Sequence, residues 1–145
     1  QVILAGKGPL EKKYRRLAEK LPNPIVMEFY EPARLLEILH MADLYVHTSD
    51  AEIEAMSCME AFACGLVPVI AASELSAGSQ FALIDESLFP VRDAALLARR
   101  IDWWIAHQAE RAEWGEKYAE YTKAHYSVEA SVHKFVDMER KAIGE

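Results

Sequence analysis

Basic charge is scarce in this 145-residue sequence. Lysine and arginine number 16 against 23 aspartates and glutamates, which leaves a net charge of −7 at pH 7. Binding to a nucleic-acid backbone requires a basic footprint, and a polybasic membrane anchor requires clustered lysines and arginines. The composition therefore argues against both kinds of partner.

Cysteine is also rare, since the sequence has only Cys58 and Cys64, both in one expected helix. Two thiols so placed cannot form a disulfide framework or a zinc site, and we expect both to be reduced, as in a cytoplasmic protein. The five histidines show no metal-ligand spacing, so no metal is expected. No apolar run approaches the roughly 20 residues of a membrane-spanning helix, and no signal peptide is recognisable.

What the sequence does contain is an alternation of short apolar runs with helical patterns. Strands are expected at residues 1–5, 25–30, 43–47 and 66–71, with helices at residues 10–21, from residue 32, and between residues 53 and 64. Such alternation predicts a parallel sheet with right-handed crossovers and helices on both faces. The predicted fold class is therefore α/β and Rossmann-like.

From Asp93 onward the pattern is nearly all helical. Asp93 is placed to cap a helix whose apolar stripe includes Trp104, and Gly115 is expected to interrupt the pattern before two further segments. Because Trp104 lies on that stripe, we assign the Trp103–Trp104 pair to packing and not to a membrane surface. We expect a Rossmann-like domain over residues 1–108, incomplete at its N-terminus, and a helical extension over residues 109–145 that packs on it.

The stretch from residue 49 to residue 70 contains the candidate functional residues. It predicts a helix that ends at Gly65 in a left-handed cap, with Glu52 before its N-terminus and Glu60 inside it, about 10 Å apart. The free N–H groups of residues 54–56 lie between the two acids and favour an anion such as phosphate. The carboxylates suit sugar hydroxyls, from which they accept hydrogen bonds. Together these features predict a binding site for a nucleotide sugar, with one carboxylate on each side of the phosphates.

This stretch resembles the E-x7-E motif of retaining family 4 glycosyltransferases, in the C-terminal, donor-binding half of their GT-B fold. The motif stands here as Glu52-IEAMSCM-Glu60 and continues into EAFACGLVPVI. The fragments LAGKGP, MADLYVHTSD, SLFP and DAALLARRI resemble further parts of that domain in the same order. The resemblance covers roughly the first 105 residues, and the helical tail follows it.

The resemblance implies a role for each part of the site. Glu52 would be the catalytic residue beside the sugar hydroxyls, and Glu60 would bind the ribose. The donor sugar and its phosphates would lie against Glu52, Ile53, Glu54, Ala55 and Met56. Tyr30, Glu31 and Pro32 hold the position that commonly touches the base, although an ordinary turn explains them equally well. No cofactor is implied besides the donor substrate, for which a UDP-sugar is favoured.

Two departures from the family pattern matter. The usual Gly-Phe-Gly after the first acid is replaced here by Ile53-Glu54-Ala55, which makes close backbone approach to a phosphate less assured. This variant, together with SELSAGSQFAL and IDWWI, resembles the branch that glucosylates diacylglycerol or sterols. The family's basic pair, which neutralises the diphosphate, has no visible counterpart.

We therefore expect the donor-binding half of a hexosyltransferase, inactive by itself. A missing N-terminal domain would bind the lipid or glycan acceptor and would make any contact with the inner face of the membrane. In GT-B enzymes the last helix commonly crosses to that domain, so some apolar residues within 127–143 would be left exposed here. A GT-B sugar-nucleotide epimerase is an alternative, although the cleft histidines and basic groups that it needs were not found. A non-catalytic α/β interaction or regulatory domain is a second alternative, of a different class.

Overall fold

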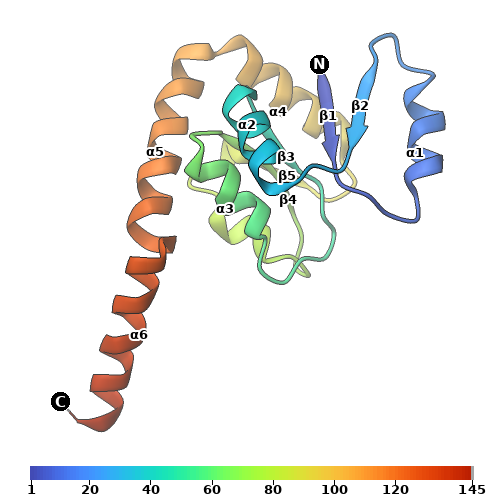
Figure 1. Cartoon of the computed structure of the whole chain (residues 1–145). Coiled ribbons are helices and arrows are strands. Elements are labelled where there is room, and N and C mark those ends of the chain that lie inside the picture. Colours follow the sequence, from blue (N-terminus) through green and yellow to red (C-terminus); the bar gives the residue numbers. More distant parts are fainter. Residues whose placement is uncertain (145) are drawn as a thin grey trace. The chain divides into compact units, whose positions relative to one another are not determined.

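The computed structural model describes residues 1–144, and the chain divides into two compact units, Gln1–Leu39 and His40–Glu145 (Figure 1). Each unit holds its own parallel sheet, of two strands in the first and three in the second. Among the described residues, no helix has the length and apolar character needed to cross a membrane. The predicted parallel pairing is thus present in both units.

The first unit is a βαβα segment. Strand β1 (Val2–Ala5) pairs in parallel with β2 (Ile25–Glu28), helix α1 (Glu11–Ala18) connects them, and α2 (Pro32–Met41) follows. Gly6, at φ 142°, turns the chain off the sheet while its N–H donates to the Glu28 carbonyl. Helix α1 is shorter than the predicted range of residues 10–21, because the chain turns before the proline-rich segment that starts at residue 22.

The apolar side chains of the first unit are largely exposed. Tyr14 and Leu17 of α1 are 46% and 49% exposed, and β1 is exposed along its whole length. Among the described residues of this unit, only Ile38 is buried. A two-stranded sheet with its helices has too little surface to enclose a core of its own.

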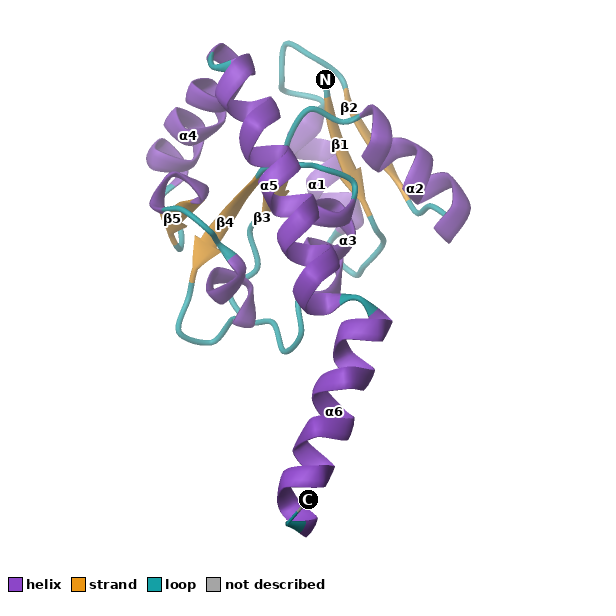
Figure 2. Cartoon of the chain, turned by 90° about the vertical axis from the view of Figure 1, so that its left-hand side faces the viewer, coloured by secondary structure: helices purple, strands orange, loops and turns teal. Residues whose placement is uncertain are grey.

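The second unit is built on a three-stranded parallel sheet with β4 in the centre (Figure 2). Its strands are β3 (Tyr45–His47), β4 (Pro68–Ala72) and β5 (Leu88–Pro90), and α3 (Met56–Ala63) crosses over from β3 to β4. The short 3-10 helices η1 (Ala77–Phe81) and η2 (Asp85–Ser87) precede β5. Val69 and Ile70 of β4 are fully buried, as the apolar run predicted for a strand covered on both faces.

Three helices complete this unit: α4 (Ala94–Ala106), α5 (Gln108–Tyr126) and α6 (Val128–Ile143). The predicted cap of α4 is confirmed, because Asp93 Oδ1 accepts a hydrogen bond of 2.8 Å from the Leu96 N–H. Trp104 is fully buried, as its place on the apolar stripe predicted. Trp103, 37% exposed, packs edge-on against Trp104 and stacks on His107.

The prediction that Gly115 interrupts the helical pattern is wrong. Helix α5 continues through this position, which lies against the C-terminus of α3. A Cβ atom on Gly115 would come within 2.2 Å of the carbonyl oxygen of Gly65. Gly65 itself has φ 78°, the left-handed cap predicted for the end of α3. Gly115 therefore marks a close approach of α5 to the end of α3, at which residue 115 has no room for a side chain.

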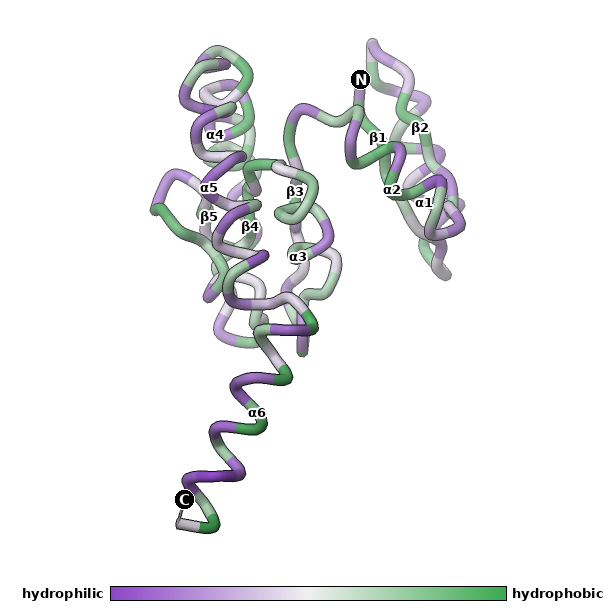
Figure 3. Tube along the Cα trace, turned by 60° about the vertical axis from the view of Figure 1, so that its left-hand side comes forward, coloured by the Kyte–Doolittle hydropathy of each residue, from purple (hydrophilic) through white to green (hydrophobic). Residues whose placement is uncertain are grey.

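Helix α6 extends from the end of α5, away from the sheet of its unit (Figures 1 and 2). Ser127 caps it by accepting a hydrogen bond from the Ala130 N–H. No residue of α6 is buried, although its sequence alternates between polar and apolar residues (Figure 3). Its exposed apolar residues include Val128, Val132, Phe135, Met138 and Ile143.

Candidate functional site

The loop between β3 and α3 is fixed to the loop that follows β4. The Glu52 N–H donates to the Leu75 carbonyl, and the Ala77 N–H donates to the Glu52 carbonyl at 2.9 Å. The Ser73 hydroxyl adds a hydrogen bond to the Asp50 carbonyl. Two loops at the carboxyl end of the second sheet are therefore joined by backbone hydrogen bonds, and they place Glu52 where parallel sheets collect their ligands.

Arg92, in the turn after β5, binds the loop between β3 and α3. Its guanidinium donates twice to Asp50 Oδ2, at 2.9 and 3.2 Å. The backbone of Arg92 has φ 67°, a left-handed conformation that disfavours most side chains. All three strands of the second sheet thus contribute their following loops to the surroundings of Glu52.

An open pocket of about 450 Å³ lies at the N-terminus of α3. It is lined by Glu52, Ile53, Glu54, Met56 and Ser57. Four of the five residues predicted to surround the donor sugar and phosphates therefore meet around one cavity. The fifth, Ala55, is 1% exposed, and Ser57 takes a place in the lining that the sequence did not assign.

The backbone at the pocket is arranged to receive an anion. Ala55 caps α3 at φ 49° and ψ 41°, without a side-chain hydrogen bond to the helix. None of the described residues accepts a hydrogen bond from the N–H of Met56 or Ser57, whereas the Cys58 N–H bonds to the Ala55 carbonyl. No described residue accepts a hydrogen bond from the N–H of Glu54 or Ala55 either, so the unpaired amides extend over residues 54–57. Together with the helix dipole they favour negative charge.

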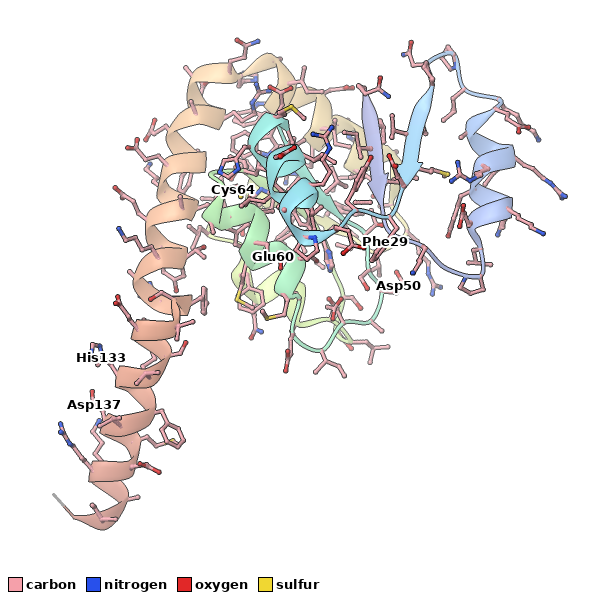
Figure 4. All side chains as sticks on the ribbon, viewed as in Figure 1. Phe29, Asp50, Glu60, Cys64, His133 and Asp137 are labelled. Carbon is pink, nitrogen blue, oxygen red and sulfur yellow. The ribbon has the colours of Figure 1, made fainter. Side chains whose placement is uncertain are left out.

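The two acids of the motif differ in their surroundings. Glu52 is partly buried, and its Oε1 accepts a hydrogen bond of 3.0 Å from the N–H of the next residue, Ile53. Glu60 is exposed on α3, one turn before Cys64, and no described side chain forms an ion pair with it (Figure 4). Both carboxylates are free to accept hydrogen bonds from a ligand, since Glu52 retains a second oxygen.

A hydrogen-bonded group lies beneath the pocket. The Tyr45 hydroxyl contacts Ser57 Oγ at 2.9 Å and His47 Nδ1 at 3.3 Å. Burial raises the pKa of the Tyr45 phenol. Burial lowers the pKa of the His47 imidazole, and the negative charge of Glu52 partly offsets this lowering. Burial also raises the pKa of the Cys58 thiol to about 11, so this cysteine is a neutral packing group at pH 7.

The residues predicted to bind the base belong to the first unit. Tyr30 and Glu31 follow β2, and Pro32 begins α2. Burial, followed by the nearby Glu28, raises the pKa of the Tyr30 phenol. At the carboxyl ends of β1 and β2, the Lys7 ammonium lies 4.3 Å from the centre of the Phe29 ring, a contact that the sequence did not reveal. The base-binding assignment stays a prediction.

A parallel α/β unit with an acidic loop and a helix N-terminus at the carboxyl edge of its sheet has the architecture of a nucleotide-binding domain. The sequence profile of the family described as Glycosyl transferases group 1 matches residues 1–121. The chain therefore belongs to this family of glycosyltransferases. The predicted relationship and the GT-B type of α/β fold are confirmed.

A solved structure supports the same relationship. The crystal structure of the catalytic domain of cholesterol-alpha-glucosyltransferase from Helicobacter pylori matches with a TM-score of 0.81 and 45% sequence identity. The match covers 85% of this chain and 77% of that chain. Among curated proteins, none matches the sequence.

Proposed function

We propose that the second unit binds the donor of a retaining glycosyltransferase that transfers glucose, or a related hexose, from UDP to a membrane lipid. The observation that carries the proposal is the pocket at the N-terminus of α3, which combines free amides with the carboxylate of Glu52. Amides favour the diphosphate, and a carboxylate accepts hydrogen bonds from sugar hydroxyls. Glu60, further along the helix, accepts from the ribose.

The similarity to a cholesterol-alpha-glucosyltransferase supports glucose and a sterol-like lipid acceptor. It also supports retention, because an α-glucoside made from an α-linked nucleotide sugar keeps the configuration of its donor. The Ile53-Glu54-Ala55 variant of the loop agrees with this branch of the family. In the complete enzyme, the acceptor is bound by a second domain that faces the donor pocket.

The pocket lining contains two glutamates and no lysine or arginine. The diphosphate would therefore depend on the α3 amides alone for stabilisation, without the charge neutralisation that supports its departure. We expect the 145-residue chain to bind UDP-glucose with a dissociation constant of about 1 mM, which corresponds to about −4 kcal/mol, and not to transfer sugar. Micromolar binding measured by calorimetry would contradict this account of the missing charge.

The different roles proposed for Glu52 and Glu60 provide a more specific test. Loss of a charge-assisted hydrogen bond costs about 1.5–3 kcal/mol, roughly ten- to a hundredfold in affinity. We expect Glu60→Ala to weaken binding of both UDP and UDP-glucose, whereas Glu52→Ala weakens binding of UDP-glucose and leaves UDP unchanged. Chemical-shift titration by NMR measures both affinities in the millimolar range.

Glu116→Ala, an exposed substitution on α5, is the matched control and should change neither affinity. Equal losses for both ligands in both variants would overturn the division of roles. If neither ligand shifts the amides of Met56 and Ser57 in the unsubstituted chain, the donor-site assignment is wrong. The non-catalytic interaction domain would then be the better hypothesis.

A further inference from the structure

His47 is a buried polar side chain to which the proposed donor site assigns no role. It is 8% exposed at the carboxyl end of β3, directly before the acidic loop. Its Nε2 atom is buried and has no hydrogen-bond partner among the described residues. Since leaving a buried polar atom unpaired is unfavourable, such an atom indicates a hydrogen-bond partner that becomes available when a ligand binds.

The other ring nitrogen connects His47 to the pocket on one side. Nδ1 lies 3.3 Å from the Tyr45 hydroxyl, which is 2.9 Å from Ser57 Oγ, and Ser57 lines the pocket. In this structure the Tyr45 hydroxyl donates to Ser57 Oγ, and both hydroxyl protons can rotate. When the pair reverses, so that the Ser57 hydroxyl donates to Tyr45 and Tyr45 donates to Nδ1, the proton of the neutral imidazole resides on Nε2. In that arrangement Nε2 is an unused donor.

The Cδ2 side of the ring faces the turn that is hydrogen-bonded to Glu52. Gly78 packs against Cδ2, the carbon bonded to Nε2, because a Cβ on Gly78 would be 3.2 Å from that atom. The neighbouring Ala77 donates its N–H to the Glu52 carbonyl. The imidazole edge and the backbone of Glu52 therefore meet at one turn, while the Glu52 carboxylate is hydrogen-bonded to the Ile53 N–H.

We infer that His47 is a positioning residue for Glu52: when a donor occupies the pocket, the Glu52 carboxylate turns from the Ile53 N–H to accept a hydrogen bond from His47 Nε2. The ligand takes the released N–H, and the second carboxylate oxygen is aimed at the sugar. The Ser57–Tyr45–His47–Glu52 chain then joins two parts of the pocket lining through the interior of the unit. This inference rests on the proposed function.

The test follows the imidazole itself. In ring-nitrogen NMR of the 145-residue chain, we expect the His47 signals to show a proton on Nε2. Saturating UDP-glucose should shift that proton downfield and slow its exchange with water. The signal is assigned by its disappearance in His47→Gln, and His133→Gln, which removes an exposed histidine of α6, is the matched control (Figure 4).

Affinity gives a second readout. His47→Phe should weaken UDP-glucose about tenfold with UDP unchanged, and His47→Gln, whose amide nitrogen can replace Nε2, should restore most of the loss. A role confined to packing would instead weaken both ligands together or lower stability alone. If UDP-glucose shifts the Met56 and Ser57 amides and leaves the His47 Nε2 proton unchanged, His47 does not position Glu52 and the donor site stands. If those amides do not respond, the proposed function and this inference are both overturned.

Discussion

Within the described part of the chain, two residues other than glycine hold left-handed backbone conformations that glycine adopts without strain. Ala55 has φ 49° at the start of α3, and Arg92 has φ 67° before α4. Each such conformation costs an L-residue roughly 1–2 kcal/mol, and strain of this kind tends to collect at functional sites. Both residues border the acidic loop, so local strain and the proposed donor pocket coincide. The replacement of the family's glycine by Ala55 leaves the loop in a conformation suited to glycine.

Tyr118 shows how one hydroxyl joins separate elements of the second unit. It is 1% exposed, it accepts a hydrogen bond of 2.9 Å from the Leu83 N–H, and it donates one of 2.9 Å to Ser87 Oγ. Tyr118→Phe removes both bonds and leaves buried groups unsatisfied. We expect a loss of about 1–3 kcal/mol in the free energy of unfolding, measured by urea titration. Tyr121→Phe, at a position that is 37% exposed, should cost less than about 0.5 kcal/mol; equal losses in the two variants would contradict the assignment.

At the scale of elements, the signals that could be read from sequence were local ones. The left-handed glycine at residue 65, the side-chain cap by Asp93 and the burial of Trp104 each follow from short-range chemistry, and the structure confirms them. Contacts between elements distant in sequence left no such signal. The role of Gly115 depends on Gly65, fifty positions away, and the role of Tyr45 depends on Ser57 across a turn. The motif indicated four of the five residues that line the pocket, but neither Ser57 nor the hydrogen-bonded group beneath the pocket.

The crossing of α3 and α5 allows a test in which two physical effects oppose each other. By helix propensity alone, Gly115→Ala should stabilise α5 by about 1 kcal/mol. The added methyl would lie 2.2 Å from the Gly65 carbonyl oxygen, a backbone atom that cannot rotate away. We expect the steric effect to dominate, with a net loss of at least about 2 kcal/mol in the free energy of unfolding.

The neighbouring exposed substitution Glu116→Ala is the control, and its effect should stay within about 0.5 kcal/mol. Circular dichroism during urea unfolding measures both variants. A stabilised Gly115→Ala protein would mean that the two helices do not approach each other at this point.

For the whole molecule, charge and apolar surface give opposite expectations about membranes. The net charge of −7 disfavours an anionic lipid surface, whereas α6 presents an uncovered apolar stripe. That helix carries three acidic and three basic residues, so it provides no net attraction to anionic headgroups. We expect the 145-residue chain not to float with vesicles of phosphatidylcholine, phosphatidylserine and cholesterol.

Flotation of the chain would contradict this expectation, and two variants identify the cause. Loss of flotation in Phe135→Glu would assign membrane contact to α6. Loss in Trp103→Ala would show that the assignment of the tryptophan pair to packing is wrong. Both positions are more than a third exposed, at 55% and 37%, so each substitution is compatible with folding.

The pairing of Glu52 with Ser76 has a consequence for changes in loop length. The two residues form a parallel bridge with hydrogen bonds on either side. The position of Glu52 is therefore set by the number of residues between the end of β4 and Ser76. Deleting or inserting one residue between Ala72 and Ser76 would shift that register, and a shift of one residue turns a side chain to the opposite face of an extended segment. The Glu52 carboxylate, the proposed catalytic group, would then face away from its pocket, although its own sequence motif would be intact. This loop should accordingly tolerate substitutions, whereas insertions and deletions should displace Glu52.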